Sequence, residues 1–412
     1  MARILFENAR LLDVDAGRAR PGHSVLVEDD RIAAVEAGAI AAEAAQRIDV
    51  GGRVLMPGLI DAHVHVAITT MNLAAMEQRP ASLLSQEARV ILERMLARGF
   101  TSVRDAGGAD WGLAEAVERG LIRGPRIFYS GRVLSQTGGH GDFRSRMDAP
   151  NVCACGAHTS GFSHVVDGVA SVRRAAREEL RRGATQLKLM ASGGVASPTD
   201  AITNLQYSPD EMRAAVEEAE AFGTYAMAHA YTPAAVSRAV LAGVRTIEHG
   251  NLIDVATADL MAERGAYLVP TLVTYFKIEE LGRKLGFPEV SQRKVKDVLD
   301  AGLASLTLAR SAGVRMGFGT DLLGETHEHQ SEEFAIRAKV LPPAEVIRQA
   351  TRVNAEILGR SGELGVIAPG AIADLLVVDG DPLADLSVLA DPESGLALIL
   401  KGGAIVRNRL AA

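Results

Sequence analysis

The stretch that decides the fold is MPGLIDAHVH, residues Met56–His65. We predict a β-strand here, in which residues two apart project to the same side, so that His63 and His65 point together. They would lie at the C-terminal end of a first barrel strand, which is the active end of such strands in barrel enzymes. Neutral imidazoles at this spacing suit a borderline metal such as zinc. Taken alone, the pair fits two half-buried histidines of an ordinary strand equally well.

Length and composition narrow the class of protein. The chain has 412 residues, 48% of them hydrophobic, and a formal net charge of −7. This length predicts a large domain with a smaller one. The negative charge argues against nucleic-acid partners and against membrane phosphates. Two cysteines cannot build a disulfide framework, and neither a signal-peptide pattern nor a membrane-length apolar run is recognised. We therefore expect a cytoplasmic protein.

Short apolar runs alternate with helical stretches through most of the chain, starting at Gly52. Ser85–Arg98, for example, predicts a helix that Gly99 terminates. Such alternation predicts a parallel sheet, and eight units fit a closed (β/α)8 TIM barrel over residues 57–359 better than an open sheet. One strand is expected within Val54–Val66, and the others are Thr101–Arg104, Arg126–Tyr129, Gln186–Met190, Thr224–Ala228, Arg245–Glu248, Ala266–Val269 and Arg315–Phe318.

The two ends of the chain have a different residue pattern. Brief β-favouring runs bounded by Gly, Asp and Pro occupy the first residues, and the same pattern returns after about Arg360, as in Ala373–Asp379 and Leu396–Lys401. We expect residues 1–56 and 360–412 to form one small β-sandwich domain, with the barrel inserted between its two halves.

Further polar residues occupy matching places in other units. His229, His249 and Asp321 each follow a separate expected strand at its C-terminal end. Any one of them could be an ordinary polar residue with a satisfied partner. Together with His63 and His65 they are hard to explain that way, because buried polar groups need partners and a metal ion supplies a common one.

Lys188 lies inside an expected strand, LKLM at Leu187–Met190, that otherwise has core character. Burial disfavours the ammonium form of lysine. A neutral amine can react with carbon dioxide to give a carbamate, whose two oxygens could bridge two metal ions. From the residue alone, a structural lysine that reaches out of the barrel remains the favoured interpretation.

Taken together, these segments resemble the amidohydrolase superfamily. MPGLIDAHVH resembles its opening signature, Lys188–Gly194 resembles the lysine segment of its binuclear branch, and Gly370–Leu375 resembles the return into its small β domain. The resemblance covers nearly the whole chain. It implies N6-carboxylysine at Lys188 and two divalent metal ions, with zinc expected. The implied ligands are His63, His65, Lys188, His229, His249 and Asp321.

Two loops narrow the resemblance. Gly138–Asp142 (GGHGD) and Ser192–Asp200 (SGGVASPTD) resemble a group that includes Xaa-Pro dipeptidases, Xaa-Arg/Lys carboxypeptidase-like enzymes and ochratoxin-hydrolysing amidases. This implies a small-molecule amide or dipeptide substrate that is cut beside a free carboxylate. It also implies that His140 and Tyr231 contact the substrate carbonyl or carboxylate. A homo-oligomer is expected, with an octamer as one candidate.

The resemblance also suggests a mechanism. One metal ion would be held by His63, His65 and Asp321, and the other by His229 and His249, with the carbamate and a hydroxide as bridges. Metal coordination lowers the pKa of water from about 15.7 to about 7. His140 would donate a hydrogen bond to the developing oxyanion. Asp321 would take the proton of the attacking hydroxide and deliver it to the leaving amine.

Other functions fit less well. Deaminases of the superfamily generally use one metal and lack the bridging lysine, so Lys188 argues against them. Cyclic amidases also use the lysine, and only the loops at Gly138–Asp142 and Ser192–Asp200 disfavour them. A non-catalytic binding protein is disfavoured because such relatives usually lose metal ligands, whereas all six positions are filled here.

Three further features are interpreted as structural. Cys153 and Cys155, with His158 and His164 nearby, do not have the usual C-x2-C spacing, so a second zinc site is not expected. The basic cluster of Arg293, Lys294 and Lys296 is interpreted as a solvated helix face. Arg104 is expected to form a buried ion pair with its neighbour Asp105, and a role of Arg104 in substrate binding is less favoured.

Overall fold

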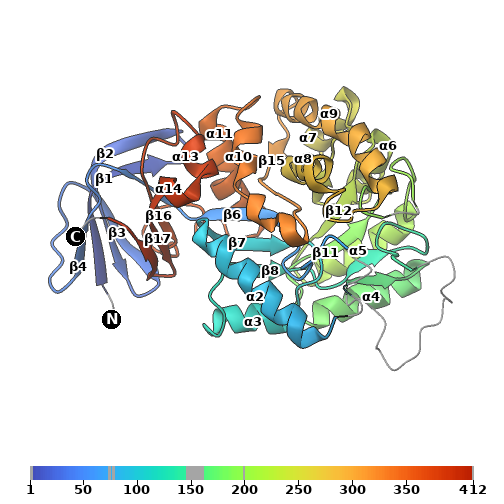
Figure 1. The fold of residues 1–412 in the computed structure, drawn as a ribbon, viewed down its shortest axis with the longest axis horizontal. Helices are drawn as coiled ribbons and strands as arrows, with labels where there is room; N and C mark the ends of the chain where they lie inside the picture. Colours follow the sequence, from blue (N-terminus) through green and yellow to red (C-terminus); the bar gives the residue numbers. More distant parts are fainter. Residues whose placement is uncertain (1–2, 73–75, 77–78, 145–161, 198–199, 411–412) are drawn as a thin grey trace.

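The computed structural model describes residues 3–72, 76, 79–144, 162–197 and 200–410 (Figure 1). Cys153, Cys155 and His158 lie outside the described residues, so the expectation about a second zinc site stays untested. His164 is described, and its Nε2 donates to Glu179 Oε1 at 2.8 Å.

The central strands form two parallel sheets, with the orders β6-β7-β8 and β10-β9-β11-β12-β13-β14-β15. Backbone hydrogen bonds from Ala62 N to Phe318 O (2.8 Å) and from Thr185 N to Tyr129 O (2.9 Å) connect segments of the two sheets. The result is a TIM-barrel-like α/β fold. Its strands are β6 (Leu59–Val64), β7 (Phe100–Asp105), β8 (Arg126–Tyr129), β9 (Val133–Ser135), β10 (Ser163–Val165), β11 (Leu187–Met190), β12 (Ala226–Ala230), β13 (Thr246–His249), β14 (Tyr267–Val269) and β15 (Arg315–Met316).

The segment Val54–Val66, which was expected to carry one strand, holds two. It is divided at Gly58 into β5 (Val54–Pro57), which pairs in a different sheet, and β6. Gly58 N donates to Asp374 O at 2.9 Å, and a Cβ at this position would collide with the side chain of Thr101. The absence of a side chain therefore lets the backbone cross closely from one sheet to the other.

Helices follow the central strands and surround them (Figure 1). Ser208 caps one of them, because its Oγ accepts from Glu211 N at 3.3 Å while Glu211 accepts from Ser208 N at 2.8 Å. Helix α2 begins at Ala81, four residues before the expected start at Ser85. The helices are α2 (Ala81–Ala97), α3 (Trp111–Glu118), α4 (Val169–Arg181), α5 (Pro209–Ala221), α6 (Pro233–Leu241), α7 (Val255–Glu263), α8 (Leu272–Leu281), α9 (Glu289–Ser311), η1 (Gly324–His329), α10 (Glu332–Arg337), α11 (Pro343–Arg348), η2 (Gln349–Val353) and α12 (Asn354–Ile357).

Strands from both chain ends share one sheet, drawn at the left of Figure 1, with the order β18-β17-β16-β5-β1-β2-β3 and β4 paired to β1. The two ends meet where β16 runs antiparallel to β5, with Leu375 opposite Pro57. A sandwich and the exact domain boundaries stay predictions. The elements are β1 (Arg3–Asp13), β2 (Arg18–Glu28), β3 (Arg31–Ala37), β4 (Gln46–Asp49), β16 (Leu375–Val378), α13 (Ser387–Ala390), α14 (Pro392–Gly395), β17 (Leu396–Lys401) and β18 (Ala404–Asn408).

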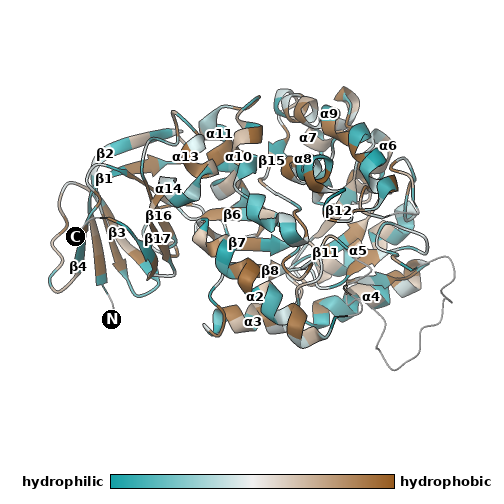
Figure 2. Cartoon of the chain, viewed as in Figure 1, coloured by the Kyte–Doolittle hydropathy of each residue, from teal (hydrophilic) through white to brown (hydrophobic). Residues whose placement is uncertain are grey.

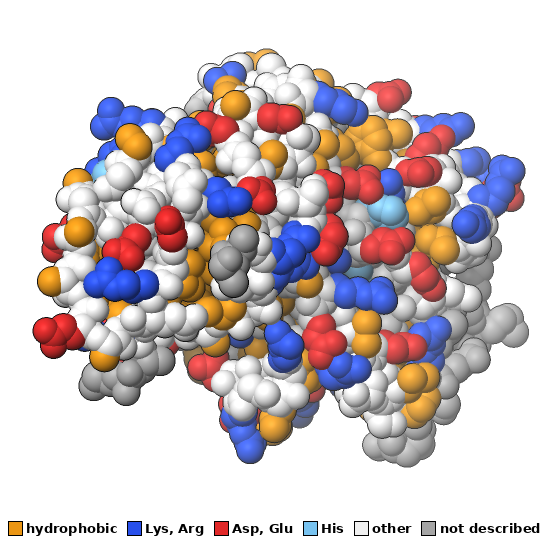
Figure 3. Space-filling model, turned by 60° about the vertical axis from the view of Figure 1, so that its left-hand side comes forward, with side chains coloured by type: hydrophobic (Ala, Val, Ile, Leu, Met, Phe, Trp, Pro, Cys, Tyr) orange, Lys and Arg blue, Asp and Glu red, His pale blue; other side chains and the backbone are white. Residues whose placement is uncertain are grey.

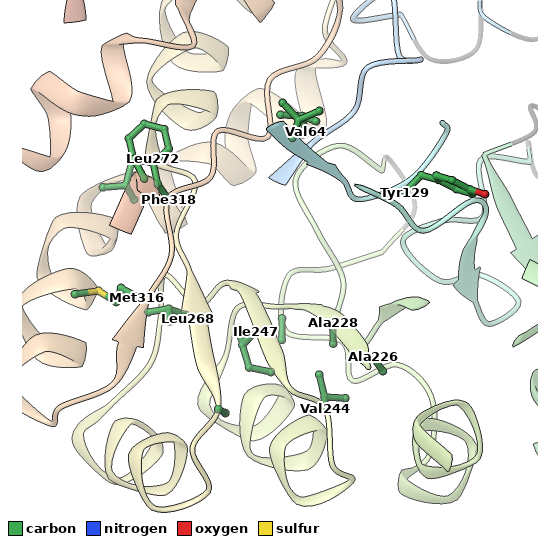
Figure 4. Close-up of a cluster of buried hydrophobic side chains, with 14 of the residues drawn as sticks. Val64, Tyr129, Ala226, Ala228, Val244, Ile247, Leu268, Leu272, Met316 and Phe318 are labelled. Atoms are coloured by element: carbon green, nitrogen blue, oxygen red, sulfur yellow. The ribbon is translucent and has the colours of Figure 1, made fainter. Parts of the chain in front are cut away.

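The main hydrophobic core lies between the central strands and their helices. Figure 4 shows part of it, with Ala228, Ile247 and Leu268 on neighbouring strands. Hydrophobic residues alternate with hydrophilic ones along the surrounding helices (Figure 2). Acidic and basic side chains are interspersed over the face in Figure 3. Among the described residues, no helix combines the length and the apolar character that a membrane span needs.

Candidate metal centre

A small cavity of about 50 Å³ brings the predicted ligands together at the C-terminal ends of the central strands. These side chains come from four strands and from the segment after β15, yet all of them face the same space. His140, from the segment after β9, also borders it. The predicted site residues that line the cavity are His63, His65, His140, Lys188, His229, His249 and Asp321.

His63 and His65 lie at the end of β6, and each has one ring nitrogen fixed by a neighbour. His63 Nδ1 donates to Glu248 Oε2 at 2.6 Å, and His65 Nδ1 donates to Gly107 O at 2.9 Å. Each Nε2 then carries a free lone pair. These atoms lie 3.3 Å and 3.2 Å from Asp321 Oδ1. Fixing the outer nitrogen of an imidazole is the usual device that orients a metal-binding histidine.

His229 and His249 form the opposite side of the cavity. Their rings lie 4.6 Å apart between centroids. His229 Nε2 donates to Gly193 O at 3.1 Å, which leaves Nδ1 free, and His249 Nδ1 contacts Thr271 Oγ1 at 2.8 Å. Burial lowers the pKa of both histidines well below the usual value. Both are therefore neutral imidazoles, the form that binds metal ions.

Asp321 sits in the middle of this group. Burial alone would raise the pKa of its carboxyl group, but the adjacent imidazoles of His63 and His65 hold it well below the usual range. Asp321 is thus ionised at neutral pH. Its backbone has φ of 52° and that of His249 has φ of 73°, a left-handed conformation that is uncommon outside glycine. Such strained positions cluster at functional sites.

Lys188 projects from β11 into the same cavity and is 2% exposed. Burial lowers the pKa of its amine to about 8, although the nearby Glu248 and Asp321 oppose the shift. A substantial fraction of the Lys188 amine is therefore neutral near physiological pH. The alternative from the sequence, a lysine that reaches out of the barrel, is wrong because the amine is enclosed with the histidines.

The donor set fits divalent metal ions. His63, His249 and Asp321 each offer a ligand atom within 4.8 Å of the others. His63 Nε2 is buried and has no hydrogen-bond partner among the described residues. An orphaned buried nitrogen is costly unless something binds it. Neutral imidazoles with a carboxylate are typical ligands of zinc.

Arg104 pairs with Glu248, so the expected ion pair with Asp105 is wrong. Arg104 Nη2 donates to both carboxylate oxygens of Glu248 at 2.9 Å, and Nε donates to Ala62 O at 2.6 Å. Arg104 is fully buried, so it is held in the barrel interior by its own partners. Asp105 instead accepts from backbone N–H groups, including that of Val66 at 2.8 Å.

Glu248 was missed in the sequence analysis. It connects Arg104 to His63, and despite its burial Arg104 lowers the pKa of its carboxyl group to about 2. The signal was present, because a glutamate and an arginine both occupy interior positions of expected strands, where charges need each other. Their pairing across two strands could not be derived from the sequence.

His140 is held by a network that the sequence analysis also missed. Its Nδ1 donates to Ser197 Oγ at 2.7 Å, and the Ser197 hydroxyl donates to Asp200. The His140 ring stacks on that of His229, with 4.3 Å between centroids. His140 N donates to Gln206 Oε1 at 2.8 Å. The backbone and Nδ1 are thus fixed, and Nε2 is the ring nitrogen left for the cavity.

Lys294 does not belong to a solvated helix face, which corrects the interpretation of the basic cluster. From α9 its ammonium donates to Gly194 O (2.9 Å), Ser197 O (2.7 Å) and Asp200 O. These carbonyls belong to the loop that contacts His140. Lys296 is exposed on the same helix, as expected.

Tyr231 is buried beside the cavity rather than lining it. Its ring contacts the rings of His229 (4.8 Å) and His249 (5.3 Å), and its hydroxyl lies 2.9 Å from that of Tyr275. Its predicted contact with substrate therefore stays a prediction.

The fold and the site together define a class of protein: a TIM-barrel-like protein with a cluster of His, Lys and Asp at the strand ends. The sequence profile of the Amidohydrolase family matches residues 54–405, and the chain belongs to that family. Its members hydrolyse carbon–nitrogen bonds, which places this chain among such hydrolases.

Individual proteins that are similar to this chain have more specific names than the family. The chain is 33% identical over 368 residues to the ochratoxinase of Aspergillus niger, a match that covers 86% of this chain and 76% of that protein. A solved prolidase complexed with N-methylphosphonate-L-proline is 53% identical, with a TM-score of 0.96 and coverage of 99% of this chain and 100% of that one. A Xaa-Pro dipeptidase with bound methionine is 29% identical, with a TM-score of 0.88 and coverage of 99% and 100%.

Proposed function

We propose that this protein is a metal-dependent hydrolase with two metal ions that cuts an amide or peptide bond beside a free carboxylate. The substrates would be Xaa-Pro dipeptides or N-acyl amino acids. The observation that carries the proposal is the single cavity lined by all six predicted ligands. The similarity to a prolidase and to an ochratoxinase supports the amide as the scissile group.

The chain offers a ligand set for each metal ion. His63, His65 and Asp321 would hold one, and His229 and His249 the other, with carboxylated Lys188 shared between them. We propose zinc, because the donors are mainly imidazoles. Bound divalent ions supply hydroxide near neutral pH and polarise a carbonyl group.

Side chains of the protein would perform the remaining steps of the reaction. Asp321 is ionised, so its carboxylate can accept a proton and pass it to the nitrogen of the leaving amine. His140 faces the cavity with Nε2, and with a proton on both ring nitrogens it would donate from Nε2 to the carbonyl oxygen of the substrate. Glu248 holds the ring of His63 in one tautomer. Tyr231 would contact the carboxylate-bearing half of the substrate.

We also propose the barrel closure, the cellular location and the oligomeric state that the sequence predicts. We propose that the two central sheets close into a (β/α)8 barrel, supported by the hydrogen bond from Ala62 N to Phe318 O at 2.8 Å. We propose a cytoplasmic homo-oligomer. Light scattering coupled to size-exclusion chromatography tests the oligomer directly.

Metal removal tests the central claim. Elemental analysis of the purified protein should find about two metal ions per chain, as in two-metal hydrolases. Chelation should abolish hydrolysis of a panel of Xaa-Pro dipeptides and N-acyl amino acids, and zinc or manganese should restore it. Full activity in metal-free protein would exclude this mechanism, and hydrolysis of cyclic amides alone would favour a cyclic amidase.

A further inference from the structure

The cavity at the metal centre is too small for a substrate. It measures about 50 Å³, whereas a cavity that holds a single water molecule needs roughly 10–15 Å³. Sites that enclose small organic ligands usually measure about 300–1,000 Å³. The larger groups of any dipeptide must therefore be accommodated outside the ring of metal ligands.

A second cavity of about 360 Å³ adjoins the first one. Ile68 and Phe162 line both cavities. Phe162 packs its ring on that of His65, with 5.7 Å between centroids, so the shared wall stands directly beside a predicted metal ligand. We call this cavity the α2–α3 pocket. Its lining residues are Ala67, Ile68, Met76, Ala81, Leu84, Ser85, Ala88, Gly108, Ala109, Asp110, Gly112, Leu113, Ala116, Ile122 and Phe162.

The chemistry of the α2–α3 pocket suits an uncharged apolar group. Its walls are mainly aliphatic side chains of the two helices, and none of the described lining residues is Lys or Arg. Among the described lining residues the one carboxylate is that of Asp110, which caps α3 by accepting from Leu113 N at 3.0 Å. Burial of an apolar group there would be favourable, and burial of a charge would be costly.

The position of the pocket selects one half of the substrate. The shared wall lies on the His65 side of the metal centre, through Phe162. The free carboxylate on the amine side of the scissile bond would be costly to bury among these apolar walls, where none of the described lining residues is a cation. The group on the carbonyl side is therefore the one directed toward the α2–α3 pocket.

We propose that the α2–α3 pocket binds a bulky apolar group on the carbonyl side of the scissile amide. This inference rests on the proposed function and specifies its substrate class. The substrates are amides whose acyl part carries an aromatic or branched aliphatic group, such as Phe-Pro or Leu-Pro. Ile68 and Phe162, which line both cavities, are the residues that such a group would pass.

Filling the pocket tests the proposal. Ala116 lines it from α3, and Ala116→Phe places a ring inside it. Ser85 lines it from the exposed face of α2, so Ser85→Phe fills the rim without disturbing the core and covers the case in which the first variant does not fold. Glu115→Phe and Gln86→Phe put the same ring on exposed neighbouring positions of the same helices and serve as matched controls.

The readout is the ratio of kcat/KM for Phe-Pro to kcat/KM for Gly-Pro, measured with the zinc-loaded protein. We expect the wild-type ratio to exceed one and to fall about tenfold or more in the filled variants, while the controls keep it within about twofold. An equal loss on both dipeptides, or an unchanged ratio, overturns the assignment of the pocket. A wild-type protein that hydrolyses no member of the panel overturns the proposed function itself, and this inference with it.

Discussion

Glu248 is the residue on which the arrangement of the first metal ligand depends. Its carboxylate accepts from both Arg104 (2.9 Å) and His63 (2.6 Å), and all three side chains are fully buried. Glu248 thus fixes the tautomer of His63 and balances the positive charge of Arg104. Such outer partners of a metal ligand tune the metal affinity without touching the ion.

Replacing this carboxylate should weaken both the metal site and the fold. In Glu248→Gln, Arg104 loses its counter-charge, which costs about 3–5 kcal/mol of unfolding free energy, and metal affinity falls roughly 10- to 100-fold. Denaturant unfolding and metal titration measure the two effects. Glu263→Gln, at an exposed position, is the control. Wild-type values in both measurements would contradict the role of Glu248.

Asp321 is the residue whose loss should separate metal binding from turnover. Asp321→Asn keeps a similar shape but cannot accept a proton, and we expect kcat to fall about 100- to 10,000-fold while at least one metal ion stays bound. Steady-state kinetics and elemental analysis on the same sample check this. A rate close to that of the wild type would remove Asp321 from the proton transfer.

At the scale of elements, helix α9 stabilises a loop that belongs to the active site. The ammonium of Lys294 reaches from this helix to three carbonyls of the loop after β11, and the same loop carries Ser197, the partner of His140. The helix therefore positions a catalytic candidate that lies about one hundred and fifty residues earlier in the chain. Hydrogen bonds from one cation to several carbonyl oxygens can hold a loop that has no regular secondary structure.

Loss of this anchor should impair catalysis before it affects the metals. Lys294→Met leaves several carbonyls without a donor, so we expect about 1–3 kcal/mol lower stability and a kcat reduced about tenfold, with unchanged metal content. Lys296→Met, exposed on the same helix, should behave like the wild type. If the two variants have the same kcat, the loop does not depend on Lys294.

At the scale of the whole molecule, acid stability should depend on His327 of η1. This side chain is buried, and its Nε2 donates to Ile68 O at 3.1 Å. Burial lowers the pKa of His327 from 6.5 to about 4. The unfolded chain therefore binds a proton at higher pH than the folded chain does. Above about pH 6.5 neither state is protonated and His327 costs nothing, whereas the fold loses stability as the pH decreases from about 6.5 to 4.

His327→Gln should reduce this acid sensitivity. The shift of the pKa corresponds to roughly 2–3 kcal/mol between about pH 7.5 and pH 4.5, and the variant should lack that part of the decrease. Denaturant unfolding at both pH values gives the difference. His23→Gln, near the surface of β2, provides a comparison. An equal decrease in the variant and the wild type would exclude His327 as the cause.

The sequence by itself determined the alternation of strands and helices and the polar residues at the strand ends. These are local properties: periodicity and chain order place His63, His65, His229, His249 and Asp321 at one edge of a set of parallel strands, because parallel strands all end on the same side. Their roles as ligands remain predictions, but their convergence on one cavity was expected.

Only the tertiary structure decided which distant groups meet. Arg104 was expected to pair with its neighbour Asp105, yet adjacent residues of a strand point to opposite faces, and Glu248 from another strand faces the guanidinium instead. Lys294 looked solvated because its helix is polar around it, and its contacts are with residues nearly one hundred positions earlier. The division of Val54–Val66 at Gly58 depends on the close approach of Thr101. Each outcome rests on a contact between segments far apart in the chain, which local periodicity does not encode.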